Sequence, residues 1–216
     1  MISRREFTLM AAVLASASAG AANAQGKWQP GKHYRLVVHP QPTSSAGKVE
    51  VAEYFWYGCG HCYALDPALE EWKTKKASYI DFIRVPAMWG PVHRQHAKLY
   101  YTLQALQRPE LHSKAFDAIH VLGLPLSAPE EVSARAAQFA FVKDFGITAG
   151  QFDNAYDSMT VAMNLRKADA LTQNLAIASV PTLVIQGKYA TSVDEAGGET
   201  QLLALINDLA AGEKPR

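Results

Sequence analysis

The sequence contains very little cysteine: among 216 residues there are two, Cys59 and Cys62. A structural zinc site needs about four ligands, usually two cysteine pairs or one pair with spaced histidines. Covalent haem attachment needs a histidine directly after the second cysteine, whereas Tyr63 stands there. A merely structural disulfide would gain little chain entropy from so short a loop. The pair therefore favours redox chemistry, and no metal, nucleotide or haem cofactor is implied.

The chain also lacks a surplus of charge and an apolar run of membrane length. Its 21 basic and 20 acidic residues nearly balance, which argues against nucleic acid as a partner. The weakly apolar run at 9–22 follows Arg4 and Arg5 and is too short and too rich in Ala and Ser to span a bilayer. Ala-Asn-Ala at 22–24 fits a cleavage site. We predict that residues 1–24 are a cleavable signal peptide for export by the Sec or the twin-arginine pathway.

The cysteine pair lies between a predicted strand and a predicted helix. Residues 51–57 are mostly β-branched and aromatic, which is typical of a strand covered on both faces, and Gly58 ends the run. From Cys62 onward, apolar residues recur at spacings of three and four, which predicts a helix. The free N–H groups and the positive dipole end at a helix start stabilise a thiolate. This placement predicts a reactive cysteine.

The remaining pattern predicts one α/β domain with a helical insertion. A strand at 79–85 completes a strand–helix–strand unit with parallel strands, and an earlier strand is predicted at 33–39. Residues 93–177 are helical throughout, with a capping box from Ser127 to Glu130 and a helix start at Thr148. An antiparallel hairpin at 182–191 and a helix at 201–209 close the chain.

These features together resemble the DsbA-type thiol:disulfide oxidoreductases, exported proteins with a thioredoxin fold and an inserted all-helical domain. The segment Cys59-Gly60-His61-Cys62 is similar to the family's Cys-x-His-Cys site, although many members have Pro where Gly60 stands. The resemblance covers the whole chain after the signal. It implies a thioredoxin-like domain at 25–90 and 178–216 and an inserted helical domain at 91–177.

The cysteines are expected to have different roles. Cys59 lies at the exposed helix start and is the expected nucleophile, while Cys62, one turn further, is expected to resolve the mixed disulfide. A protonated His61 between them would stabilise the Cys59 thiolate, although an exposed histidine there could also be neutral and without a role.

Glu53 lies six residues before Cys59, inside the apolar strand. The resemblance implies a buried acidic residue under the active site, which could accept a proton from Cys62. The alternative is a salt bridge or a position that faces water. Many relatives pair this residue with lysine, and here Lys75, Lys76 and Arg84 are candidates. Without a full ion pair, Glu53→Gln would leave the fold at least as stable.

Ser179-Val180-Pro181-Thr182 matches the family segment whose cis-proline faces the cysteines. A cis bond before Pro181 would turn the backbone of Val180 outward to bind a substrate strand. An ordinary strand start is the alternative for Pro181. Aromatic and apolar residues nearby could border a client groove or belong to the core: Trp56, Tyr57, Met88 and Trp89.

The resemblance implies a periplasmic thiol:disulfide interchange protein that donates the Cys59–Cys62 disulfide to unfolded or newly exported cysteine-containing proteins. A membrane quinone-linked reoxidase of the DsbB kind is the implied second partner, and a monomer is expected. Two alternatives remain open. One is a reductase or isomerase on the same scaffold, because Gly-His between cysteines also occurs in disulfide isomerases. The other is a peptide-binding chaperone with a merely structural disulfide.

Overall fold

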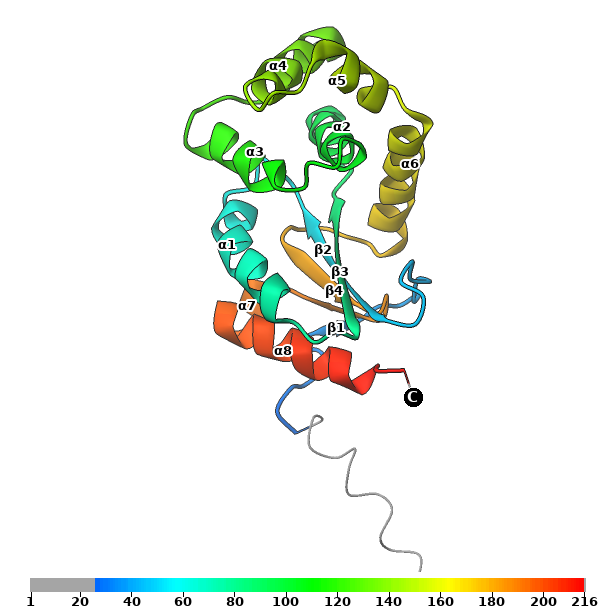
Figure 1. Cartoon of the computed structure of the whole chain (residues 1–216). Helices are drawn as coiled ribbons and strands as arrows, with labels where there is room; N and C mark the ends of the chain where they lie inside the picture. The colour runs from blue at the N-terminus through cyan, green and yellow to red at the C-terminus, as the bar shows by residue number, and fades with distance from the viewer. Residues whose placement is uncertain (1–25, 216) are drawn as a thin grey trace, which may run out of the picture.

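The computed structural model describes residues 26–215, which form a five-stranded mixed sheet with helices on both faces (Figure 1). The strand order is β1-β5-β4-β2-β3. The bounds are β1 Arg35–Leu36, β2 Val49–Phe55, β3 Ile80–Pro86, β4 Thr182–Ile185 and β5 Tyr189–Thr191. Only β2 and β3 run parallel, and every other pairing is antiparallel. The predicted signal at 1–24 lies outside the described residues.

Helix α1 (Gly60–Lys75) joins β2 to β3, so the predicted strand–helix–strand unit is confirmed. Five helices then follow before the chain returns to the sheet at β4: α2 Pro91–Ala105, α3 Leu111–His120, α4 Glu131–Lys143, α5 Ala149–Tyr156 and α6 Met159–Asn174. They gather at one end of the sheet, coloured green to yellow in Figure 1. Helices α7 (Val193–Ala196) and α8 (Glu199–Gly212) end the chain.

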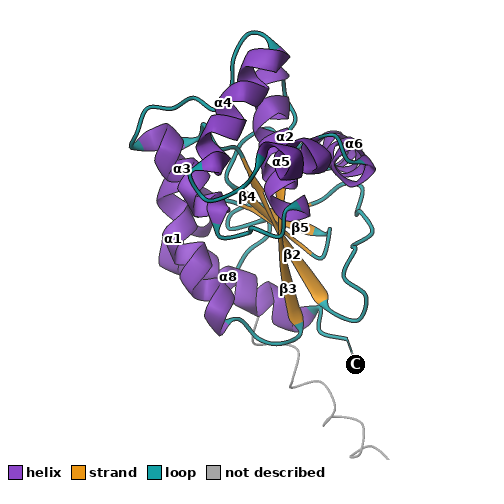
Figure 2. Cartoon of the chain, turned by 45° about the horizontal axis from the view of Figure 1, so that its top comes forward, coloured by secondary structure: helices purple, strands orange, loops and turns teal. Residues whose placement is uncertain are grey.

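The two faces of the sheet are covered by different helices. Alternate residues of a strand point to opposite faces. Val51 of β2 packs with Leu69 of α1 and Leu205 of α8, whereas Tyr54 packs with Ala97 of α2 and Ala168 of α6. Figure 2 shows α1 and α8 side by side along one side of the sheet. The central strand is therefore buried from both sides, as its sequence predicts.

A third core lies among the inserted helices and reaches the cysteines. Its members include Phe55, Tyr57 and Cys62 from the β2–α1 region and Leu103 and Phe116 from the insertion. The end of β2 and the start of α1 are thus fixed by packing against the inserted helices. No helix within residues 26–215 has the length and apolar character needed to cross a membrane.

Several local predictions need correction. The first strand spans only Arg35–Leu36, because the residues around it are largely exposed and β1 pairs with β5 alone. The capping box from Ser127 is wrong: Glu130 itself is the N-cap of α4, without a side-chain cap. The short helix α7 is not apparent in the sequence pattern. The helix start at Thr148 is confirmed, because Thr148 and Gln151 form a reciprocal capping box.

Candidate redox-active site

The two cysteines lie where β2 gives way to α1. After Phe55 the chain turns, and the Cys59 N–H donates to Trp56 O at 2.9 Å. Cys59 is the N-cap of α1 and is partly exposed, whereas Cys62 is fully buried. Both are free thiols in the structure. A Cβ on Gly58 would lie 2.4 Å from the Trp56 ring, so a larger residue there would have to displace the indole.

The two thiols have opposite electrostatic properties. A hydrogen bond from the Cys62 thiol, together with the N–H groups of Cys62 and His61, lowers the pKa of Cys59 to about 6 against the opposing effect of burial. Burial raises the pKa of Cys62 far above its usual range, and the nearby charge of Glu53 raises it further. Near neutral pH, Cys59 is therefore the thiolate and Cys62 the thiol.

His61 has an exposed side chain beside Cys59. Its charge lowers the Cys59 pKa, but this effect is smaller than that of the backbone N–H of His61 and that of the Cys62 thiol. The position of His61 at the helix start therefore contributes more to the Cys59 pKa than its imidazole does.

The Val180–Pro181 segment faces the nucleophile. The Val180–Pro181 peptide bond is cis, as the resemblance implies. The Cys59 Sγ lies 3.4 Å from Val180 O, and in its protonated form the thiol donates to this carbonyl. A groove of about 330 Å³ begins here, lined by residues that include His61, Val180, Pro181 and Val193. The structure thus brings Cys59, His61, Val180 and Pro181 together.

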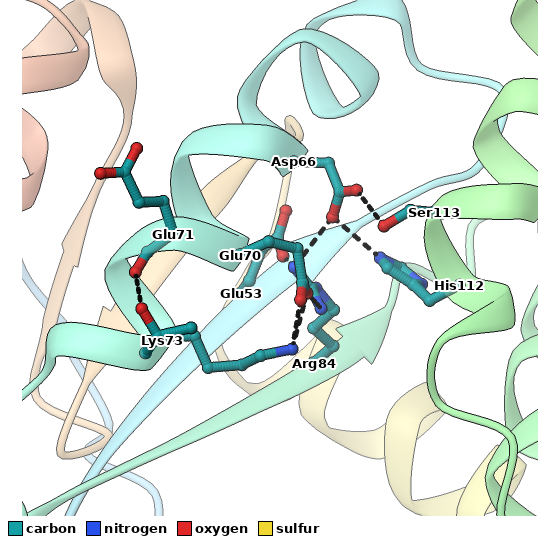
Figure 3. A network of polar contacts seen from close by, with 9 residues as sticks. Glu53, Asp66, Glu70, Glu71, Lys73, Arg84, His112 and Ser113 are labelled. Carbon is teal, nitrogen blue, oxygen red and sulfur yellow. Dashed lines mark hydrogen bonds and ion pairs between the residues drawn. The ribbon is translucent and has the colours of Figure 1, made fainter.

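Glu53 belongs to an ionic network with Arg84, Asp66 and Glu70 (Figure 3). It is 1% exposed, and its register partner on β3 is Arg84. Arg84 Nε donates to Glu53 Oε2 at 2.7 Å, and the rest of the guanidinium binds Asp66 at 2.9 Å and Glu70 at 2.7 Å. The ion-pair partner is therefore Arg84, and neither Lys75 nor Lys76 binds Glu53. The sequence predicts that Glu53→Gln leaves the fold at least as stable, on the condition that Glu53 has no full ion pair. Glu53 has a full ion pair, so this condition is not met.

Three carboxyl groups of the network, those of Glu53, Asp66 and Glu70, share the Arg84 guanidinium. Burial raises the pKa of Glu53 even though Arg84 opposes it. For Asp66, burial acts in the same direction, but the nearby His112 imidazole, the hydrogen bond from Ser113 and the charge of Arg84 lower its pKa overall. Among these carboxyl groups, Glu53 is thus the one adapted to hold a proton.

Helix α3 supplies two residues of the ionic network that the sequence does not predict. Ser113 Oγ donates to Asp66 Oδ2 at 2.6 Å, and His112 Nε2 lies 3.5 Å from Asp66 Oδ1 (Figure 3). His112 Nδ1 lies 3.0 Å from the Tyr57 hydroxyl. Burial lowers the pKa of His112 to about 4. One sequence signal pointed here: Asp66 follows Cys62 by one helical turn, on the apolar face of α1.

The aromatic residues near the site divide into core and surface. Tyr57 and Met88 are buried, so both belong to the core. Trp89 is 42% exposed and donates its indole N–H to Ile177 O. Trp56 is partly exposed and packs against His93, with ring centroids 4.4 Å apart. Of the four, Trp56 and Trp89 are the two that reach the surface.

A dithiol with one acidic and one buried sulfur, at the junction of a central strand and its crossover helix, is the site of a thiol:disulfide oxidoreductase. No protein-family model matches the chain. The chain is 33% identical over 208 residues to the thiol:disulfide interchange protein DsbA of Pseudomonas aeruginosa, covering 95% of this chain and 96% of that protein. It is 40% identical over 163 residues to DsbA of Burkholderia cepacia, covering 74% of each chain.

The solved structures agree. The crystal structure of Pseudomonas aeruginosa DsbA superposes with a TM-score of 0.79 at 30% identity, covering 88% of this chain and 96% of that one. The chain therefore belongs to the DsbA family of thiol:disulfide interchange proteins. The predicted α/β class, a thioredoxin fold with an inserted all-helical segment, is confirmed.

Proposed function

We propose that the Cys59–Cys62 disulfide is donated to cysteine-containing proteins that have just been exported and are still folding. The observation that carries this proposal is the asymmetry of the two thiols, with the pKa of Cys59 lowered to about 6 and that of Cys62 raised by burial. A stabilised Cys59 thiolate favours the dithiol form of the protein, so the disulfide form is a stronger oxidant.

The exchange has two steps. A client thiolate attacks Cys59 Sγ, the Cys59–Cys62 bond breaks, and a mixed disulfide forms between the client and Cys59. A second client thiolate then attacks the client sulfur of that bond and releases Cys59 as a thiolate. The client loses two electrons and the protein gains them. Cys59 is a good leaving group because of its low pKa.

Cys62 needs a proton when it leaves and must lose it again when the disulfide is restored. A thiolate at this buried position is unfavourable, because burial raises the pKa of Cys62. Glu53 lies close enough for its charge to act on Cys62, and burial raises its own pKa. We assign Glu53 as the group that exchanges this proton with Cys62. Arg84 positions the Glu53 carboxyl group.

The client backbone is proposed to pair with Val180, beside the reacting sulfur. The Val180 carbonyl lies 3.4 Å from Cys59 Sγ, and the groove at this point is lined by His61 and Pro181 as well. A strand bound there would bring a client cysteine to Cys59.

The setting of the protein is part of the same proposal. Residues 1–24 are assigned as a cleaved export signal, with the mature protein acting as a periplasmic monomer. Residues 25–90 and 178–216 are assigned to the thioredoxin-like domain, and 91–177 to the inserted domain. A membrane reoxidase of the DsbB kind restores the Cys59–Cys62 disulfide.

A single-turnover experiment tests the function. The isolated disulfide form is mixed with a reduced, unfolded client in the absence of other oxidants, and thiols are counted after alkylation. We expect one client disulfide for each Cys59–Cys62 dithiol that appears. Cys62→Ala cannot form this disulfide, so it should leave the client thiols unchanged. A client that keeps its thiols while Cys59 and Cys62 stay paired would refute the donor function.

A further inference from the structure

A second hollow lies on the inserted helices, apart from the Val180 groove. It has a volume of about 880 Å³, within the range of about 300–1,000 Å³ typical of ligand pockets. The walls are α3, α4 and the connection between them, which lie next to each other in Figure 1. Most of the lining is apolar, and Leu122, Leu124, Phe141 and Phe145 contribute to it. The hollow can hold several apolar side chains at once.

The rim of this pocket exposes more apolar surface than the fold requires. Val121, Leu122 and Leu124 are 65%, 67% and 45% exposed, in four consecutive positions after α3. Scattered exposed apolar residues are normal, whereas a contiguous patch around a concave site indicates an interaction surface. The connection therefore leaves these side chains outside the core.

The charges around the pocket favour a partner without net charge. Two lysines, Lys114 and Lys143, are balanced by Asp117 and Asp144. Lys114 and Asp117 already face each other at 3.4 Å. An acyl chain with an anionic head, or a polyanion, would find no excess of positive charge here. An apolar stretch of polypeptide fits both the lining and the charge.

Side-chain contacts link the wall of the pocket to the redox site. Asp117 in its wall accepts a hydrogen bond at 3.3 Å from the hydroxyl of Tyr63, the residue after Cys62. His120, next to Val121, stacks on the Tyr63 ring with centroids 4.8 Å apart. The same imidazole donates from Nε2 to Tyr57 O at 2.8 Å, two residues before Cys59. The pocket wall therefore contacts the residues that flank the two cysteines in the chain.

We propose that the α3–α4 pocket is a second docking site, which binds an apolar segment of the unfolded client whose thiol reacts at Cys59. Unfolded proteins expose apolar segments that folded proteins bury. A site that binds an exposed apolar segment near the nucleophile would select clients that are still folding. The inference rests on the proposed function, because it assigns a specificity surface to the same exchange.

Two variants close the pocket at exposed positions. Ala140→Trp fills it from α4, and Leu122→Glu places a charge on its rim, and both residues are exposed and line the pocket. The matched controls are Val132→Trp and Val132→Glu, because Val132 is on α4, is 73% exposed and is outside the pocket lining. Near-UV circular dichroism and the Cys59 thiolate absorbance check that all four variants keep the fold and the site.

The assay compares three substrates of the disulfide form. One is a dithiol peptide with a leucine- and phenylalanine-rich segment, the second has serine and glycine in that segment, and the third is dithiothreitol. For Ala140→Trp and Leu122→Glu we expect about a tenfold loss in the second-order rate constant for oxidation of the apolar peptide, the scale of losing about one buried apolar side chain. The polar peptide, dithiothreitol and both Val132 variants should keep wild-type values.

Direct binding provides an independent measurement. A fluorescent apolar peptide without cysteine should bind the wild type and the Val132 variants and lose affinity for Ala140→Trp. The proposal is overturned if both pocket variants oxidise the apolar peptide normally, or if they lose as much on dithiothreitol. It is also overturned if the wild type is a dimer that Ala140→Trp dissociates, since a second copy would then cover the pocket. If the wild type oxidises no substrate, the donor function itself fails, and peptide binding still tests the pocket.

Discussion

Removing the Cys62 thiol should raise the pKa of Cys59. The hydrogen bond from Cys62 is the largest cause that brings this pKa down to about 6. A hydrogen bond to a charged group contributes about 1.5–3 kcal/mol, and 1.36 kcal/mol corresponds to one pKa unit. Cys62→Ala should therefore move the Cys59 pKa to about 7–8. His61→Ala should raise it by less, because the charge of His61 has a smaller effect.

The same pKa makes the stability of the dithiol protein depend on pH. The pKa is about 6 when folded and about 8.5 when unfolded, so the unfolded chain binds more protons between these values. Stability from Cys59 is complete above pH ~8.5 and is lost as the pH falls through ~6. At pH 7 this amounts to about 1.4 kcal/mol, and solvent screening at the partly exposed sulfur reduces it to about 1 kcal/mol.

Two measurements check these values. Thiolate absorbance of the fully reduced protein against pH gives the Cys59 pKa, and urea unfolding at pH 5 and pH 7 gives the stability change. Cys59→Ala is the reference, because its change in unfolding free energy between pH 5 and pH 7 comes from every titrating group except Cys59. The wild type should gain about 1 kcal/mol more than this reference between pH 5 and 7, and Cys62→Ala should gain less. A wild-type Cys59 pKa above 8, or one that Cys62→Ala leaves unchanged, would show that the Cys62 thiol does not stabilise the Cys59 thiolate.

The buried ion pair and the active-site turn give three further predictions. Arg84→Met should lower the free energy of unfolding by urea by about 3–5 kcal/mol, because it leaves Glu53 buried without its cation. Glu53→Gln should lower it by only about 1–3 kcal/mol. Equal losses for the two variants would argue against the Glu53–Arg84 ion pair. Glu53→Gln should also slow the attack of Cys62 on a mixed disulfide by about 100-fold in stopped-flow fluorescence, and a normal rate would leave the carboxylate a structural role only. Gly58→Ala should cost about 1–3 kcal/mol, because its Cβ would overlap the indole ring 2.4 Å away. Gly60→Ala is the matched control, since a Cβ there meets nothing within 4 Å.

The parts of the site that depend on local chemistry could be predicted from the sequence. The strand, the glycine and the two cysteines at a helix start are consecutive, so their spacing alone indicates the redox pair. The sequence could not single out Arg84 as the partner of Glu53, because that choice depends on the register of β2 against β3. Lys75 and Lys76 were equally good candidates by charge.

The contribution of α3 could not be predicted, because it arises from the packing of the inserted helices. His112 and Ser113 reach Asp66 from a helix 47 residues further along the chain. Nothing in the local pattern of α3 indicates that contact. The failed capping box at Ser127 has a related cause: the chain reaches α4 in a conformation that makes Glu130 the N-cap.

The most direct test of the donor function is the redox state of Cys59 and Cys62 in the exported protein. Cells are quenched with acid, free thiols are alkylated with a mass tag, and the protein is resolved without reductant. If the protein donates its disulfide, most of it should carry the Cys59–Cys62 bond and take no tag. Protein found mostly as the dithiol, with two tags, would contradict the donor function and favour a reductase or isomerase.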